Sequence, residues 1–211
     1  MVQAVPAREI KLADLRDQFG LEQSEERGIF REWRADLPEI ESKQKQELDL
    51  LKRRHRYLAQ YGAAEEVVKL TMLAPLLAEA GFFDDPFRIE TETPVEIAAE
   101  EDGVIFKGRI DVLVVSGRLW VLVIESKKMG FNVTEALPQA LLYMLSSPAQ
   151  DRPSFGMATN GEDFLFIKLL DRQPPQYALS RKFTLITEDS NELFTVFRIL
   201  KRLGQLIRRT N

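Results

Sequence analysis

The sequence predicts an α/β fold with one main domain, in which helices flank a central β-sheet. Two apolar, β-branched runs at 108–115 and 119–127 flank a turn signal and are typical of a β-hairpin. The segment 63–81 has the apolar spacing of a helix and ends at a glycine. A length of 211 residues, with 45% hydrophobic and 29% charged residues, suits a soluble domain with a sizeable core.

Residues 1–62 are predicted to form an N-terminal helical arm that precedes the main domain at 63–211. Helix-like apolar spacing runs through 8–35 and is interrupted by Gly20 and Gly28. Pro38 begins a long polar helix that reaches about Tyr61. Its apolar residues are sparse, so we expect this arm to pack on the domain or to form a homodimer contact.

The main domain is predicted to begin with the helix 63–81, which Pro75 bends or divides. Pro94 marks the first strand as an edge strand. Asn160-Gly161 is a strong hairpin signal between two later strands. The expected strands are Arg88–Ile97, Gly103–Ser116, Leu119–Lys127, Ser154–Thr159, Asp163–Leu170, Tyr177–Leu179 and Phe183–Thr187, and the expected helices after 63–81 run from Thr134 to about Ser146 and from about 190 to about Arg209.

Three charged residues interrupt the apolar hairpin: Asp111, Glu125 and Lys127. An ionised carboxylate inside a strand costs several kcal/mol unless a partner compensates it. Glu125 and Lys127 are two residues apart and therefore point to the same face, together with Val121 and Val123. A divalent metal is the usual compensation where two carboxylates and a lysine converge.

The length of the hairpin turn decides whether Asp111 reaches Glu125. A three-residue turn at Ser116–Arg118 would place Asp111 opposite Val123, diagonally next to Glu125 on the same face. A two-residue turn would send Asp111 to the opposite face, because side chains alternate along a strand. A shared site therefore predicts an odd loop or a β-bulge.

Composition excludes several classes of protein and function. The chain has no cysteine, so disulfides and zinc–thiolate sites are excluded, which fits a cytoplasmic location. No signal region and no run of about 18–20 apolar residues is present, so no membrane association is expected. The net charge of −4 gives no global basic footprint, but basic stretches at 43–56 and 198–209 could contact phosphates. No G-x-x-x-x-G-K-[ST] motif of a motor is present.

Asp111, followed thirteen residues later by Glu125-Ser126-Lys127, resembles the catalytic signature of the PD-(D/E)XK nuclease superfamily. Gln139 and Tyr143 lie on one helix face and resemble the Q-x-x-x-Y element of several branches. The chain is most similar to the N-terminal nuclease domain of type I restriction enzyme R subunits, over roughly 64–170. This resemblance implies a restriction-endonuclease-like core and a metal-dependent DNA endonuclease, as a restriction-type module without a motor domain.

The resemblance also implies a role for each residue. Asp111, Glu125 and the Ser126 carbonyl would hold Mg²⁺, for which Mn²⁺ can substitute. Lys127 would orient or deprotonate the attacking water, or neutralise developing charge. Gln139 and Tyr143 would hold Lys127 and the scissile phosphate in place. Glu65, with Glu66 as the near alternative, would reach the metal from its helix, often through water.

Other interpretations stay open at this point. Asp111, Glu125 and Lys127 could form a cross-strand salt bridge on an exposed sheet face, although the apolar neighbours on that face disfavour full exposure. The chain could be a catalytically idle nuclease fold that binds nucleic acid or recruits a partner, which the acidic balance favours. RNA or branched nucleic acid could replace DNA as substrate. A motor or specificity subunit is an expected partner, and the number of metal ions is undecided.

Overall fold

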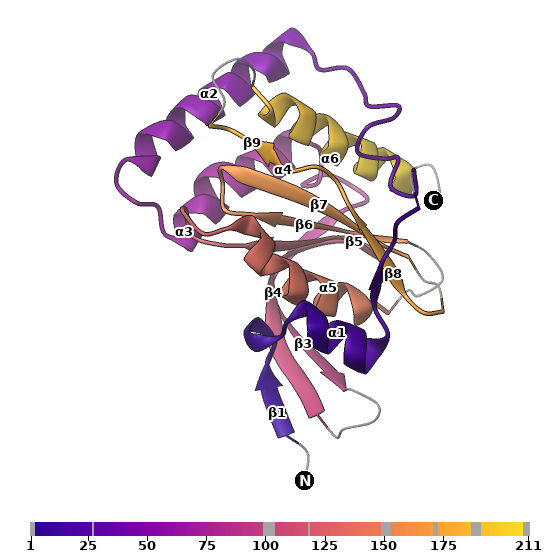
Figure 1. The fold of residues 1–211 in the computed structure, drawn as a ribbon. Coiled ribbons are helices and arrows are strands. Elements are labelled where there is room, and N and C mark those ends of the chain that lie inside the picture. Colours follow the sequence, from indigo (N-terminus) through magenta and orange to yellow (C-terminus); the bar gives the residue numbers. More distant parts are fainter. Residues whose placement is uncertain are drawn as a thin grey trace.

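The computed structural model describes residues 3–26, 28–98, 104–117, 119–148, 153–170, 173–186 and 191–208. Within these ranges the chain forms a mixed nine-stranded sheet with helices on both faces, which confirms the predicted α/β architecture (Figure 1). The helical segments are η1 (Ala7–Glu9), α1 (Leu12–Phe19), α2 (Ser42–Ala59), α3 (Glu65–Val68), η2 (Lys69–Leu73), α4 (Ala74–Glu79), η3 (Val133–Ala136), α5 (Leu137–Leu145) and α6 (Leu193–Arg208). The strands are β1 (Gln3–Pro6), β2 (Glu22–Gln23), β3 (Arg88–Ala98), β4 (Val104–Ser116), β5 (Leu119–Ser126), β6 (Ser154–Thr159), β7 (Asp163–Leu170), β8 (Gln176–Leu179) and β9 (Phe183–Thr184).

The sheet combines antiparallel hairpins with a parallel crossover. Its strand order is β1-β4-β5-β6-β7-β8-β2, while β3 pairs with β4 and β9 pairs with β7. Strands β5 and β6 are parallel and are joined through α5. Such a pair requires a crossover connection, because its second strand must start at the same end as the first. This crossover carries the chain from the end of β5, which holds Glu125 and Ser126, directly into α5.

Each face of the sheet has its own apolar core. Helices α2, α4 and α6 cover one face, where Leu48, Leu76 and Leu200 are almost completely buried. Helices α5 and α1 cover the other face, where Leu15 and Leu141 are equally buried (Figure 1). Burial of apolar area contributes about 25 cal/mol per Å², so both layers stabilise the sheet that carries the charged residues.

The N-terminal segment differs from the predicted helical arm. Strand β1 runs parallel to β4, and β2 runs parallel to β8, so this segment contributes to the same sheet as the rest of the chain. Gly20, in the left-handed region at φ 63°, ends α1, and the described residues between β2 and α2 form no helix. Tertiary pairing here overrides the helix-like spacing, because the exposed edges of β4 and β8 offer unpaired backbone groups.

The helix predicted over 63–81 is present, but a wide turn divides it. Residues Lys69–Leu73 form a π-helical segment between α3 and α4, immediately before Pro75. Proline lacks a backbone N–H and its ring crowds the carbonyl four residues earlier, so a wider turn accommodates it. Gly81, at φ 85°, follows the end of α4 as predicted. Lys69 is the first residue of this π-helical turn.

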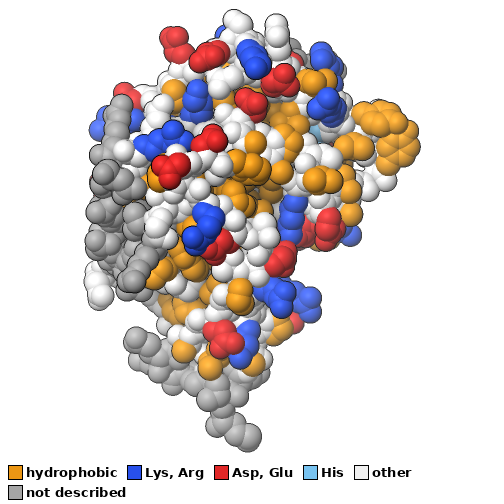
Figure 2. Space-filling model, turned by 180° about the vertical axis from the view of Figure 1, so that it is seen from behind, with side chains coloured by type: hydrophobic (Ala, Val, Ile, Leu, Met, Phe, Trp, Pro, Cys, Tyr) orange, Lys and Arg blue, Asp and Glu red, His pale blue; other side chains and the backbone are white. Residues whose placement is uncertain are grey.

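The surface seen from behind carries apolar side chains that gather near Lys and Arg side chains and project at one edge (Figure 2). Exposed large apolar residues include Tyr57, Tyr61, Leu70 and Phe83. None of the described helices is long and apolar enough to cross a membrane.

Candidate active site

A β-bulge in the hairpin brings Asp111 and Glu125 to the same face of the sheet. Ser116 pairs with Leu119, so the connection has two residues, and the three-residue turn that would pair Asp111 with Val123 is not formed. A two-residue connection alone would place Asp111 opposite Ile124, but the register shifts between Val114 and Val115. After the shift Val112 pairs with Ile124, and the next position brings Asp111 level with Glu125. The predicted need for an odd loop or a bulge is therefore confirmed.

The extra residue of the bulge is Val121, which faces the core cluster of Leu122 rather than that of Val123. This corrects the prediction that Val121 shares the face of Glu125. A bulge places two residues of one strand against one residue of its partner, so the side-chain alternation changes phase there. Only residues beyond the bulge keep the alternation that aims Glu125 at Asp111.

Asp111 and Glu125 are both buried, with exposed fractions of 8% and 1%. The Ser126 backbone N–H donates to Asp111 Oδ2 at 2.6 Å. Lys127 Nζ donates to Glu125 Oε1 at 3.0 Å, whereas Glu125 Oε2 is buried and has no hydrogen-bond partner within the described part of the chain. The structure therefore excludes a solvated salt bridge on an open sheet face. A buried carboxylate oxygen without a donor is costly and is an available acceptor for a cation.

Lys127 is tied to helix α5 by a chain of hydrogen bonds. Its Nζ donates to Gln139 Oε1 at 3.2 Å, and Gln139 Nε2 donates to the Tyr143 hydroxyl at 2.9 Å. Gln139 and Tyr143 are one helical turn apart, so α5 presents both to the sheet. The helix expected from Thr134 is preceded by η3, which Asn132 caps by accepting from the Thr134 N–H.

The electrostatic environment shifts the acid–base behaviour of this cluster. Burial, aided by the neighbouring charge of Asp111, raises the pKa of Glu125 to about 8, although Lys127 opposes the rise. Burial and the charge of Glu125 raise the pKa of Tyr143 to about 12, against hydrogen bonds to Gln139 and the Arg109 backbone. Near neutral pH the cluster therefore holds a proton on Glu125 unless a cation replaces it.

Lys69 belongs to this cluster and was missed by sequence reasoning. Its Nζ lies 2.9 Å from Asp111 Oδ1 and 2.9 Å from Glu65 Oε1, and 3.4 Å from Glu92 Oε1. Burial lowers the pKa of Lys69, but hydrogen bonds to Asp111 and Glu65 and their charges raise it more, so the net shift is upward. The only sequence signal was the Glu65–Lys69 spacing of four residues, which is common on exposed helices.

Glu65, and not Glu66, reaches the carboxylate cluster. Glu65 pairs with Lys69, and its charge acts on Glu125. Glu66 is exposed and lines an apolar groove beside Asp111. The structure thus brings Glu65, Asp111, Glu125, Lys127, Gln139 and Tyr143 to one region, where α3, the β4–β5 hairpin and α5 meet.

The donor set at this region fits a hard divalent cation. Among the described residues no group of three His, Cys, Asp or Glu side chains has the arrangement of a metal site. Mg²⁺, however, is held by one or two protein carboxylates and completes its shell with water and phosphate oxygens. Asp111 and Glu125, whose Oε2 has no hydrogen-bond partner among the described residues, are the two carboxylates that would serve as such ligands. The hydrogen bonds at Asp111 leave lone pairs on both of its oxygens.

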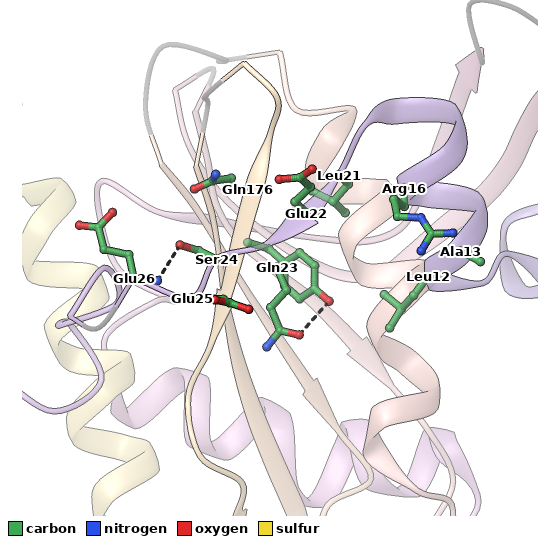
Figure 3. Close-up of a pocket in the computed structure, with 11 residues that line it drawn as sticks. Leu12, Ala13, Arg16, Leu21, Glu22, Gln23, Ser24, Glu25, Glu26 and Gln176 are labelled. Atoms are coloured by element: carbon green, nitrogen blue, oxygen red, sulfur yellow. Dashed lines mark hydrogen bonds between the residues drawn. The ribbon is translucent and has the colours of Figure 1, made fainter.

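A separate cavity of about 740 Å³ lies between α1, β2 and β8 (Figure 3). Glu22, Glu25 and Glu26 line it together with Arg16, and Gln23 contacts the Tyr177 hydroxyl at 3.4 Å. None of the predicted site residues lines this cavity. Its acidic lining is a poor match for a nucleic-acid phosphate.

Gly108 makes room for Tyr143 at the edge of the site. A Cβ at this position would lie 2.6 Å from Ala7 Cβ and would also overlap the Tyr143 hydroxyl. We expect Gly108→Ala to lower the free energy of unfolding by about 1–3 kcal/mol, as overpacking does elsewhere. Urea unfolding measures this effect. Gly204→Ala is the matched control, because its Cβ would meet Phe82 at an ordinary 3.4 Å. Equal stability of the two variants would contradict the prediction.

The sequence matches a protein-family model over residues 12–175, and that family is described as the N terminus of the type I restriction enzyme R protein. The match spans most of the chain and all six clustered residues. The chain belongs to this family. The predicted relation to type I restriction enzyme R subunits is thereby confirmed at the level of this N-terminal family. A comparison with curated proteins finds no significant match.

A solved structure also resembles the chain. It is a fragment assigned to the HsdR subunit of a type I restriction enzyme from Vibrio vulnificus YJ016, with 19% sequence identity and a TM-score of 0.43. The similarity covers 68% of this chain and 26% of that chain. The R-protein N-terminal region described here thus corresponds to about a quarter of that longer fragment.

Proposed function

We propose that this chain is the nuclease module of a type I restriction enzyme R protein and hydrolyses DNA phosphodiesters in a Mg²⁺-dependent reaction of the PD-(D/E)XK kind. The observation that carries the proposal is the convergence of Asp111, Glu125 and Lys127, with a buried Glu125 oxygen that lacks a partner. Family membership supports a restriction-type activity. Mn²⁺ is expected to substitute, because it accepts the same oxygen ligands.

Asp111, Glu125 and the Ser126 carbonyl would hold the metal ion, which supplies Lewis-acid polarisation of the phosphate and a more acidic bound water. Glu125 has to lose its proton to become a ligand, and Lys127 favours this loss through its ion pair. The Lys127 ammonium, fixed by Gln139, is placed to orient the attacking water and to offset the negative charge of the transition state.

Gln139 and Tyr143 act as positioning residues in this proposal. The Gln139 amide accepts from Lys127 and donates to Tyr143, so the amine has one favoured orientation. Glu65 holds Lys69 against Asp111 and would contact the metal through water. Preorganised charge of this kind acts most strongly where water is excluded, and burial of the carboxylates supports such an environment.

A larger assembly is part of the proposal. We expect the chain to act on DNA together with a motor or specificity subunit in the cytoplasm, and the α2 region remains our candidate for a homodimer contact. The expectation of DNA as substrate and of a partner subunit rests on the family.

A second candidate function is a nuclease fold that binds nucleic acid or a partner without cleaving. The position of Lys69 favours it. This ammonium contacts both Asp111 and Glu65 and compensates their charge without a metal. A divalent ion at Asp111 has to compete with this ion pair, which lowers its affinity.

A substrate panel separates the two functions. Single-stranded, duplex and branched DNA and RNA are incubated with the chain and Mg²⁺ or Mn²⁺, while binding is followed separately in EDTA. Under the nuclease proposal DNA cleavage appears with either metal and is absent in EDTA. Salt-dependent DNA binding without cleavage under any metal condition would select the second candidate. Thermal stabilisation by the metal alone provides a readout that does not require turnover.

A further inference from the structure

Two exposed tyrosines stand at the C-terminal end of α2, close in sequence to the proposed active site. Tyr57 is 58% exposed and Tyr61 is 72% exposed. Their rings pack edge to face, with centroids 5.4 Å apart and an interplanar angle of 66°. Tyr61 lies four residues before Glu65. Two large aromatic rings that contact each other in solvent are unusual in a monomer surface and indicate a binding function.

Arg53 and Arg54 lie one helical turn before Tyr57 and are exposed. Neither guanidinium forms a salt bridge with any residue in the described part of the chain. Unpaired arginines next to exposed aromatic rings complement a chain of phosphates and bases.

Two neighbouring grooves lie between this surface and the active site. The first, of about 540 Å³, is lined by Arg53, Arg54, Tyr57 and Leu70. The second, of about 410 Å³, shares Leu70 and has the site residues Lys69 and Asp111 in its wall. Figure 2 shows apolar side chains gathered next to basic ones on the face seen from behind. Leu70 thus lies between the α2 groove and the groove that reaches Asp111.

The second groove is mainly apolar. Leu73, Leu77, Phe83 and Ile89 line it between Leu70 and Asp111. Phe83 is 55% exposed and Leu70 is 72% exposed. A duplex presents phosphates on its outside and keeps its base faces stacked, so it offers little that fits an apolar wall. A strand with unpaired bases offers base and sugar faces to such a wall and phosphates to the arginines.

We propose that α2 and the Leu70 groove bind an unpaired nucleic-acid strand, which stacks bases on Tyr57 and Tyr61 and leads its backbone to Asp111. This inference rests on the proposed nuclease function, because a phosphodiester site beside the neighbouring groove favours nucleic acid over a protein partner. Arg53 and Arg54 hold the phosphates on the approach. The surface thereby selects strands that are already separated at the point of cleavage.

Fluorescence anisotropy with a labelled oligodeoxythymidine and a hairpin duplex of equal length, in EDTA, tests the proposal. The double variant Tyr57→Ala/Tyr61→Ala is expected to weaken single-strand binding about 10- to 100-fold and duplex binding far less. Tyr57→Phe/Tyr61→Phe keeps the rings and should bind like the wild type. Ile186→Ala, an exposed apolar residue near β9, is the matched control. Arg53→Gln/Arg54→Gln should reduce the salt slope by about 1.4 for a single strand.

The outcomes separate this inference from the proposed function. If the wild-type chain cleaves duplex DNA but does not bind the single strand, this inference is overturned and the proposed nuclease function still holds. A protein would then be the better candidate partner for the Tyr57–Tyr61 surface. Equal losses for single strand and duplex in the alanine variant would also overturn it. Single-strand binding that depends on the tyrosines, without cleavage in the presence of any metal, would support the proposed binding surface and contradict the proposed nuclease function.

Discussion

Lys127→Met is expected to lower the rate of DNA hydrolysis by about 10²–10⁴-fold, the usual effect of removing a general acid–base or charge-stabilising group. Methionine keeps the length and apolar stem of lysine but removes the ammonium that contacts Glu125 and Gln139. Stability near neutral pH should change little, because Glu125 can retain its proton when the ion pair is lost. Single-turnover cleavage with saturating Mn²⁺ measures the chemical step.

Lys107→Met is the matched control for this variant. Lys107 forms the same kind of ion pair, at 2.8 Å from Glu96, on the β3–β4 pair away from the site. The Lys107→Met variant should cleave DNA at the wild-type rate. If Lys127→Met cleaves DNA as fast as this control, Lys127 has no role in the proposed mechanism. A loss of circular-dichroism signal would instead assign its effect to folding.

Glu125→Gln is expected to stabilise the metal-free chain at pH 8 by roughly 2–4 kcal/mol relative to the wild type. The pKa of Glu125 in the folded chain is about 8, well above its ordinary value of 4.5, mainly because the group is buried. The folded state therefore binds this proton more tightly than the unfolded state does. The resulting stability is complete below about pH 4.5 and is lost as the pH rises to about 8.

Thermal unfolding in EDTA between pH 5 and 8.5 measures this dependence, with about 2–4 °C in Tm for each kcal/mol. The wild-type Tm should fall across this range, whereas the Glu125→Gln profile should be flatter. Mg²⁺ should restore much of the wild-type stability at pH 8, because a cation takes the place of the lost proton. Glu96→Gln, which alters an exposed carboxylate, should leave the wild-type profile unchanged. Parallel profiles for the wild type and Glu125→Gln would contradict the assignment.

The strands around the site could be predicted from local sequence patterns. Ser154–Thr159 and Asp163–Leu170 have the predicted bounds, because apolar runs and an Asn-Gly turn leave few alternatives. Asn160 Oδ1 accepts from the N–H of Glu162 and from that of Asp163, which explains why this residue terminates the strand. Spacing along β5 likewise predicted that Glu125 and Lys127 share a face.

The register of the hairpin was only partly predictable. The two-residue connection follows from the Ser116–Leu119 pairing, and Val121 becomes the extra residue of the bulge. Bulges depend on how a strand packs against both of its layers, and no single residue type encodes one. The sequence supported the conditional statement that a shared site requires an odd loop or a bulge, but it could not choose between them.

Lys69 shows why one part of the site could not be predicted from the sequence. Its partners Glu92 and Asp111 are 23 and 42 residues away in the chain, so the local spacing of residues cannot predict either contact. Lys69 begins the π-helical turn before Pro75, and its ammonium reaches Asp111 on β4. The N-terminal strands β1 and β2 were missed for the same reason, since their pairing partners are remote in sequence.

Side-chain periodicity and residue chemistry, which are local properties, were sufficient to identify the α/β class, the acidic hairpin and the Gln139–Tyr143 face of α5. The packing of distant segments decided which groups meet. The bulge aligned Asp111 with Glu125, the crossover helix brought Gln139 to Lys127, and the packing of the α3–α4 region on the sheet brought Lys69 to Asp111. The reason is physical: the energy of a buried charge depends on the groups around it in space, and only the folded chain defines those groups.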